Sequence, residues 1–391
     1  MNSNSMQDIL KDVYPQGAQY ERLLPQPEAS SYKNIDLSRY NLENLGLIGN
    51  GSFANVFKVR DKRNGRILAC KITSLNKGRN NPAIAERALQ EIKLLKKVNA
   101  SADSGIQLYS YTPSEQKIQS YINTAKALPG FIQPSGFDIL ELIQLGVTWT
   151  KFEEYHLKQH RKLTEKQAAA LLMDLVLPVH NMHRATDIVH RDIKKDNVLL
   201  VNENGKVRAV LADFNISKVF EGQSNNHYTI CYTPGFIHPE FEYKIKSHMT
   251  VTHKEAEQSE LYGIMQIAYC FFNSGYMAPI RGQIPTPPNS PSAKISSIIC
   301  SALNPSLARM PSFETIISQL KSILNGSNRQ INHGSNIFSN TQCYTHKNGK
   351  KKPEKNRSAN GSPSKKNQSA KFNSHDKNFS PVRVFFPKFH P

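Results

Sequence analysis

The first third of the chain changes from a strand-like to a helical pattern of apolar residues. Residues 42–72 carry short alternating apolar runs, which favour β-strands. Residues 82–98 place Ile84, Ile92 and Leu95 on one side of a 3.6-residue period. The sequence therefore predicts a small sheet followed by an amphipathic helix.

The middle of the chain is less regular. Residues 99–135 are rich in Ser, Tyr and Pro without a clear period, so we expect an insertion or a long loop. A short apolar run at 137–143 predicts a buried strand. A helix is predicted over 163–182, because Thr164 followed by Gln167 forms a capping-box pattern.

Helical signals return at residues 255–272 and 312–324. The most apolar window, residues 261–280, is about long enough to cross a membrane. Gln266 and Asn273 interrupt it, so we interpret it as a buried core helix and predict no membrane span.

The two ends of the chain differ from its centre in composition. Residues 1–40 are polar and contain Pro15 and Pro25, so we expect an extended leader without a signal peptide. Residues 326–391 contain 13 Lys and Arg against 2 Asp and Glu, which is +11 of the net charge of +19. Few large apolar residues occur there, so we expect a basic, disordered tail.

Lysines cluster within this tail at Lys350, Lys351, Lys352 and Lys355. The cluster predicts either a partner, such as a nuclear import receptor or a polyanion, or a merely solvated basic tail. The five cysteines are scattered and form no CxxC pair, which favours neither disulfides nor a zinc site. We therefore expect a reducing compartment, the cytoplasm or the nucleus.

A glycine-rich turn lies between two predicted strands. It reads Gly49-Asn50-Gly51-Ser52, with Val56 beginning the next strand. Glycines let a backbone approach phosphate groups closely, although an ordinary hairpin turn would look the same.

A lysine interrupts the apolar strand Ala69-Cys70-Lys71-Ile72. A buried ammonium is costly without a partner, although a lysine can also extend its head to solvent. Glu91, in the helix predicted over 82–98, is a candidate partner that would hold Lys71 against phosphates.

The strongest chemical signal is the run His190-Arg191-Asp192-Ile193-Lys194-Lys195-Asp196-Asn197. It resembles the catalytic loop of eukaryotic protein kinases, His-Arg-Asp-x-Lys-x-x-Asn, at every specified position. The lysine at position 194 is the form found in serine/threonine kinases. The resemblance implies that Asp192 accepts the substrate's hydroxyl proton, Lys194 steadies the γ-phosphate and Asn197 binds Mg²⁺.

Further residues match this family in order along the chain. Asp213-Phe214-Asn215 resembles Asp-Phe-Gly, which implies Asp213 as a second Mg²⁺ ligand, with Asn215 in place of the glycine. The resemblance also implies that Leu140 guards the back of an ATP pocket. The residues implied as ATP-binding are Gly49, Asn50, Gly51, Ser52, Val56, Ala69 and Lys71, with Glu141, Leu142 and Ile143 as the hinge.

The segment that follows resembles a kinase activation segment. Thr233 matches the threonine that contacts the catalytic aspartate, and Glu240 is expected to form a buried ion pair with Arg309. Phosphorylation of Ser224 or Thr229 would order the segment through Arg191, although a constitutively ordered loop fits equally well.

The resemblance implies an α+β, bilobal kinase fold over residues 41–325, with an N-lobe over about 41–143 and a C-lobe over about 144–325. The implied activity is phosphoryl transfer from ATP, with Mg²⁺, to serine or threonine of protein substrates. A pseudokinase scaffold is the alternative, because Ala54, Asn215 and Glu260 depart from the family pattern. The sequence does not identify the substrate, the subfamily or the upstream regulator.

Overall fold

The computed structural model describes most of the chain before residue 327. Lys350 to Lys355, Ser52, and the two candidate phosphorylation sites Ser224 and Thr229 lie outside the described residues. The described residues are 3–27, 35–51, 54–75, 82–102, 104–128, 137–220, 232–279, 285 and 288–326.

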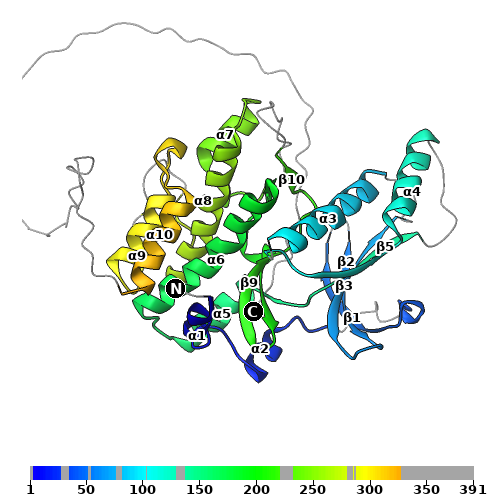
Figure 1. Ribbon diagram of the computed structural model, residues 1–391, viewed down its shortest axis with the longest axis horizontal. Coiled ribbons are helices and arrows are strands. Elements are labelled where there is room, and N and C mark those ends of the chain that lie inside the picture. Colours follow the sequence, from blue (N-terminus) through cyan, green and yellow to red (C-terminus); the bar gives the residue numbers. More distant parts are fainter. Residues whose placement is uncertain are drawn as a thin grey trace, which may run out of the picture. The chain divides into compact units, whose positions relative to one another are not determined.

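The amino-terminal part, called the N-lobe below, is a five-stranded antiparallel sheet in the order β1-β2-β3-β5-β4. Two helices, α3 and α4, lie beside it (Figure 1). Its elements are the short 3₁₀ turn η2 (Ser38–Tyr40), β1 (Leu42–Asn50), β2 (Asn55–Asp61), β3 (Ile67–Ser74), α3 (Pro82–Ser101), β4 (Leu108–Thr112), α4 (Glu115–Ala127) and β5 (Asp138–Ile143).

Strand alternation gives this sheet two different faces. Cys70 and Ile72 of β3 pack with Leu140 and Leu142 of β5 in one apolar cluster. The alternate residues, including Lys71, point to the opposite face, because successive side chains of a strand alternate. The sheet therefore buries apolar side chains on one side and presents the lysine on the other.

Of the two alternatives for residues 99–135, the long loop is wrong, because the described part of this stretch contains β4 and α4. Ser114 caps α4, and its hydroxyl accepts a hydrogen bond from the Lys117 N–H. Ile118, Tyr121 and Ile122 are buried on one side of the helix. The described part of this stretch therefore adds a strand and a helix to the N-lobe.

The carboxy-terminal part, called the C-lobe, is mainly helical. Its α6 begins with the predicted Thr164–Gln167 capping box, and α8 is buried along nearly its whole length. The helices are α5 (Trp149–Gln159), α6 (Glu165–Thr186), α7 (Pro239–Lys246), α8 (His253–Phe272), α9 (Ala293–Ala302) and α10 (Phe313–Leu324), with 3₁₀ turns η3 (Lys195–Asn197) and η4 (Leu307–Arg309).

The interpretation of residues 261–280 as a core helix is confirmed for the part that lies in α8. Its apolar side chains belong to the large C-lobe core. Among the described residues, no helix is long and apolar enough to cross a membrane.

Short strands flank the C-lobe loops that contain the candidate site residues. The run that begins at His190 lies between β7 and β8, and the run that begins at Asp213 follows β9. The strands are β6 (Val147–Thr148), β7 (Ile188–Val189), β8 (Val198–Glu203), β9 (Lys206–Leu211) and β10 (Lys218–Val219).

The expected extended leader is wrong for residues 3–24. They contain α1 (Ser3–Leu10) and α2 (Ala18–Leu23), and Leu10 and Tyr20 join the C-lobe core. The Tyr14 hydroxyl donates to Asp174 Oδ2 at 2.7 Å. Buried apolar contacts and this hydrogen bond hold the segment against the C-lobe despite its polar composition.

The same segment continues onto the N-lobe. The Lys58 Nζ donates to the Pro25 carbonyl at 3.3 Å. Pro27 lies so close to Gly46 that a Cβ at that glycine would be 2.6 Å from the proline Cβ. Gly46 also has φ of 126°, so a side chain there would be both strained and blocked. Residues 3–27 therefore contact both lobes.

The predicted α+β arrangement, with an antiparallel N-lobe sheet and a mainly helical C-lobe, is confirmed. Strand β3, helix α3 and the loops that follow β7 and β9 bring the candidate site residues together.

Candidate active site

The predicted partner of Lys71 is confirmed by geometry. Its Nζ lies 2.5 Å from Glu91 Oε2, and both side chains are largely buried. The same Nζ lies 3.5 Å from Asp213 Oδ1. Lys71 therefore joins strand β3, helix α3 and the loop after β9.

The charge of this lysine is maintained by its neighbours. Burial alone would lower the pKa of Lys71, but the carboxylates of Glu91, Glu141 and Asp213 raise it above its usual range. The ammonium therefore stays protonated and can bind phosphate oxygens.

Glu141 is a site residue whose side chain the sequence reasoning overlooked. It stands directly opposite Lys71 in the β3–β5 pair, so both side chains lie on the same face of the sheet. It is fully buried, and neither carboxylate oxygen has a hydrogen-bond partner within the described part of the chain. Burial, and then the neighbouring Glu91 carboxylate, raise the pKa of Glu141 well above its usual range.

A signal for Glu141 was present in the sequence. The glutamate interrupts the apolar strand Ile139-Leu140-Glu141-Leu142-Ile143, just as Lys71 interrupts its own strand. Two ionisable residues in neighbouring buried strands are expected to face the same site, because each is costly to bury alone.

We expect Glu141→Met to stabilise the protein by roughly 1–3 kcal/mol, because an apolar side chain replaces a buried carboxyl group that has no hydrogen-bond partner among the described residues. Chemical denaturation measures this change. Glu153→Met is the matched control, since Glu153 is also buried but is ion-paired with Lys195 at 2.7 Å, and its loss should destabilise. A less stable Glu141→Met would mean that Glu141 has a stabilising partner in solution.

The predicted hinge needs correction. Strand β5 lies between β3 and β4, so the main-chain groups of Glu141 and Leu142 take part in strand pairing and are not free for a nucleotide. The side chain of Leu140 packs on the opposite face of the sheet, so it cannot guard the pocket. The connection between the lobes begins after Ile143.

Three apolar residues of the predicted ATP-binding set, Val56, Ala69 and Ile143, share the face of Lys71. Val56 stands opposite Lys71, and Ala69 stands opposite Ile143. These apolar residues form a surface above the site that suits a flat, mainly apolar base.

The predicted phosphate-binding hairpin is present as the connection of β1 and β2. Gly49 pairs with Val56 and Asn50 with Asn55. The Gly51 N–H donates to the Ala54 carbonyl at 2.9 Å, and a Cβ at Gly51 would lie 3.1 Å from that oxygen. A glycine is therefore favoured at position 51.

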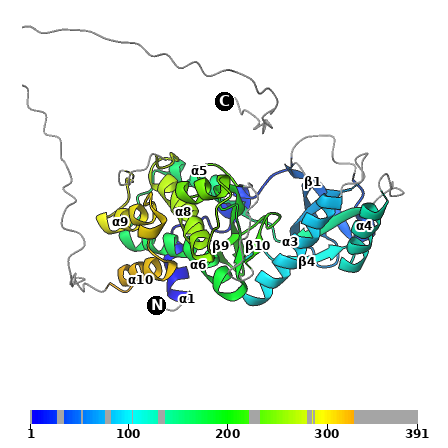
Figure 2. The ribbon, with the colours of Figure 1, turned by 90° about the horizontal axis from the view of Figure 1, so that it is seen from above.

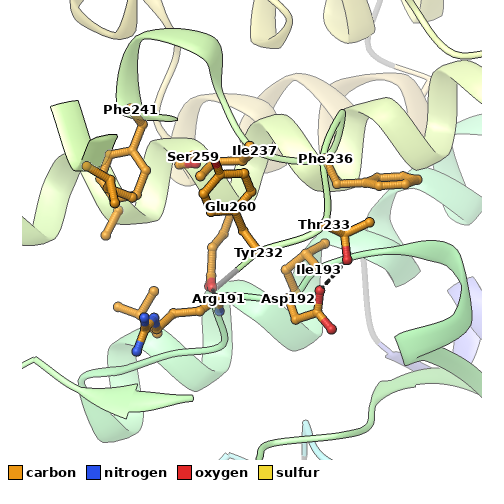
Figure 3. Close-up of a pocket in the computed structure, with 13 residues that line it drawn as sticks. Arg191, Asp192, Ile193, Tyr232, Thr233, Phe236, Ile237, Phe241, Ser259 and Glu260 are labelled. Atoms are coloured by element: carbon orange, nitrogen blue, oxygen red, sulfur yellow. Dashed lines mark hydrogen bonds between the residues drawn. The ribbon is translucent and has the colours of Figure 1, made fainter. Parts of the chain in front are cut away.

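Asp192 is the most thoroughly hydrogen-bonded group of the site. Its Oδ1 accepts from the Thr233 hydroxyl at 2.6 Å (Figure 3). Its Oδ2 accepts from Lys194 Nζ at 2.6 Å and from Asn197 Nδ2 at 2.9 Å. Burial would raise the pKa of Asp192, but the hydrogen bonds from Lys194 and Thr233 lower it below its usual value. The carboxylate is therefore ionised and oriented.

Glu260 of α8 braces the loop that carries Asp192. Its Oε1 accepts from the Arg191 N–H at 2.6 Å, and its Oε2 lies 2.6 Å from His183 Nε2. Arg191 has φ of 72°, an uncommon value that this contact helps to hold. Figure 3 shows Glu260 of α8 reaching towards Arg191. The extra methylene of Glu260 thus does not prevent bracing.

Asp213 and Phe214 connect this loop to the N-lobe. Asp213, not Asn215, is the residue with positive φ, at 65°. Phe214 is fully buried, and its ring lies 4.8 Å from that of His190. The Asn215 substitution therefore needs no left-handed backbone in this conformation.

The residues predicted to bind Mg²⁺ are suitable for that ion. Both amide hydrogens of Asn197 are directed to Asp192, which leaves its amide oxygen as a ligand. Asp213 has an accessible carboxylate beside Lys71. Mg²⁺ commonly takes one or two protein oxygens together with phosphate oxygens and waters. Within the described residues, no cluster of three or more His, Cys, Asp or Glu could hold a metal by itself.

The expected ion pair between Glu240 and Arg309 is wrong. Glu240 Oε2 instead accepts from the Leu307 N–H at 2.9 Å, and Arg309, which is described, is exposed. The carboxylate binds the start of η4 through its backbone, so the arginine side chain is not required.

Comparisons with known proteins place most of the described chain beside protein kinases in sequence. The family model described as "Protein kinase domain" matches residues 42–256, more than half of the 391-residue chain. "Serine/threonine-protein kinase tousled-like 1" of Caenorhabditis elegans is 28% identical over 203 residues, 51% of this chain and 18% of that protein. "Myosin light chain kinase A" of Dictyostelium discoideum is 26% identical over 229 residues, 59% of this chain and 66% of that protein.

A plant relative shows the same partial coverage. "CBL-interacting serine/threonine-protein kinase 19" of Arabidopsis thaliana is 25% identical over 237 residues, 60% of this chain and 41% of that protein. The matched region thus spans between about a fifth and two thirds of these relatives' lengths.

Proposed function

The chain belongs to the protein kinase family, and we propose that it transfers the γ-phosphate of ATP to serine or threonine hydroxyl groups of protein substrates. One observation carries the proposal. Lys71 lies 2.5 Å from Glu91 and 3.5 Å from Asp213, and protein kinases need this ion pair and the metal-binding aspartate in place together.

Each step of the proposed phosphoryl transfer has a side chain with suitable chemistry. Asp192 is ionised and can accept the proton of the attacking hydroxyl. Lys194 lies beside Asp192 and can place its positive charge on the transferred phosphoryl group. Lys71 can hold the other phosphates from the N-lobe side.

ATP and Mg²⁺ are part of this proposal. Asn197 and Asp213 would hold the metal ion, which neutralises charge on the phosphates when bound. Val56, Ala69 and Ile143 would contact the adenine base through their apolar side chains. Serine/threonine specificity draws support from Lys194, from the Thr233–Asp192 contact and from the relatives' names.

The geometry around the three departures from the family pattern weakens the case for a pseudokinase. Glu260 still binds the Arg191 N–H, and Asn215 requires no unusual φ. Ala54 provides a backbone carbonyl to Gly51. None of the three departures removes a group needed for phosphoryl transfer.

We expect purified protein to incorporate phosphate from ATP into a generic basic protein substrate only when Mg²⁺ is present. Metal chelation should abolish incorporation, because the phosphate charge is then uncompensated. Phosphoamino-acid analysis should find phosphoserine or phosphothreonine. Equal labelling with and without chelator, or labelling of tyrosine alone, would contradict the proposal.

The predicted partners beyond protein substrates concern the tail. Lys350 to Lys355 lie outside the described residues, so a nuclear import receptor or a polyanion as partner, and a cytoplasmic or nuclear location, stay predictions.

A further inference from the structure

Helix α4 pairs with α3, the helix that carries Glu91. Both views place α4 along the outer side of the N-lobe next to α3 (Figures 1 and 2). Glu115 at the start of α4 lies 2.7 Å from Lys96 near the end of α3. Lys126, at the other end of α4, pairs with Glu86 near the start of α3. The two helices are therefore antiparallel and tied at both ends.

The surface between the two helices is apolar and buried. Four residues of α4 at helical spacing meet four of α3 at the same spacing, and Ile139 of β5 closes the cluster from below. Tyr121 of α4 also stacks on Phe137, just before β5, with ring centroids 4.9 Å apart. The residues involved are Ala85, Ala88, Leu89 and Ile92 of α3 and Ile118, Tyr121, Ile122 and Ala125 of α4.

Glu91 lies within this clamped part of α3. Ile92, its neighbour, is fully buried in the cluster. The far end of α3 is held separately, because Leu95 and Val98 pack in the C-lobe core. Gln90 also donates to the Ser217 carbonyl at 2.8 Å, which links α3 to the segment after Asp213. Without α4, the first half of α3 would expose Ala85, Leu89 and Ile92 to water.

We infer that α4 is a positioning element, and Tyr121 a positioning residue, which hold α3 where Glu91 can pair with Lys71. The inference rests on the proposed function, since the ion pair matters for phosphoryl transfer. A small displacement of one helix is enough to break a close ion pair. The helix that holds α3 in place therefore also determines whether Glu91 can reach Lys71. The chain thus carries its own support for the catalytic conformation of α3.

The test compares Tyr121→Ala with three variants of the full chain. Tyr121→Phe keeps the ring and removes a buried hydroxyl that has no partner among the described residues. Gln119→Ala changes an exposed side chain of the same helix. Ile317→Ala creates a buried cavity in α10, far along the chain from α3, and controls for loss of stability as such.

We expect Tyr121→Ala to lower kcat/KM for ATP about tenfold or more at a temperature where the variant is folded. Tyr121→Phe and Gln119→Ala should keep the parental value, and Ile317→Ala should keep it despite a lower melting temperature. Hydrogen exchange over residues 82–101 provides a readout besides activity, and it should rise in Tyr121→Ala but not in Ile317→Ala.

Parental kcat/KM and unchanged exchange over α3 in Tyr121→Ala would overturn the inference, and so would equal loss of activity in Ile317→Ala. If Tyr121→Ala does not fold, Ile122→Val, which removes one methyl group from the same cluster, replaces it under the same criteria. A parent without phosphoryl transfer would refute the proposed function alone. The exchange of α3 would then still decide whether α4 fixes this helix.

Discussion

Replacing Asp192 by asparagine is expected to lower kcat by about 10²–10⁴-fold, the range of a lost general base. The asparagine amide cannot take a proton from the substrate hydroxyl. It also presents either an oxygen or an NH₂ group where the carboxylate now accepts from Thr233 and Lys194. Steady-state kinetics with a saturating protein substrate measures kcat, while KM for ATP should stay close to the parental value.

Asp196→Asn is the matched control for this change. Asp196 lies in the same loop but is exposed, and its carboxylate accepts from the Thr150 hydroxyl at 2.7 Å. Its kcat should stay within about twofold of the parent, as expected for a surface hydrogen bond. Parental kcat in Asp192→Asn would refute the role given to this carboxylate.

Glu260→Ala is expected to destabilise the protein by about 3–5 kcal/mol, because it leaves one buried and one partly buried group without their acceptor. These groups are the Arg191 N–H and the His183 ring, each 2.6 Å from a Glu260 oxygen. Chemical denaturation measures the loss as a lower midpoint at unchanged slope. Glu260→Asp should fall between parent and alanine, since the shorter side chain cannot reach both partners.

The control for Glu260 is Glu257→Ala on the same helix. Glu257 is partly exposed and lies 3.8 Å from His183 Nδ1 and 3.7 Å from His253 Nδ1. Loss of these weak contacts should cost less than about 1 kcal/mol. Equal destabilisation by both alanine variants would mean that Glu260 does not brace the Asp192 loop specifically.

Helices whose apolar residues recur over a long stretch were predictable. Pro82–Ser101 and Glu165–Thr186 were expected within a few residues, because each has a clear period and the second also has a capping box. α4 was missed although Ile118, Tyr121, Ile122 and Ala125 follow the helical spacing. The polar and proline-containing residues around this short run concealed its period.

Residues 3–24 illustrate a second reason for error. α1 and α2 have 8 and 6 residues, too short to be stable alone in water. Their structure depends on burying Leu10, Tyr14 and Tyr20 against distant parts of the chain. A local pattern does not contain that information.

The candidate site also contains features that the sequence predicts and features that it does not. The cluster of Asp192, Lys194 and Asn197 was predictable because these residues are neighbours in one loop. The Lys71–Glu91 pair was predictable because both residues are charged and stand in apolar surroundings. The position of the lobe connection was not, since strand register decides which backbone groups are free. The prediction of a Glu240–Arg309 ion pair was wrong because a backbone N–H can replace a side chain as the partner of a carboxylate.

Catalysis of phosphoryl transfer is what distinguishes an active kinase-family chain from a scaffold. The most direct measurement is phosphate incorporation from Mg²⁺-ATP into a basic protein substrate by the purified parent, Asp192→Asn and Lys71→Met, prepared identically. We predict incorporation by the parent and its loss in both variants, because one lacks the proton acceptor and the other the cation paired with Glu91. Equal incorporation by all three would identify a contaminating kinase, contradict catalysis by this site and favour a scaffold.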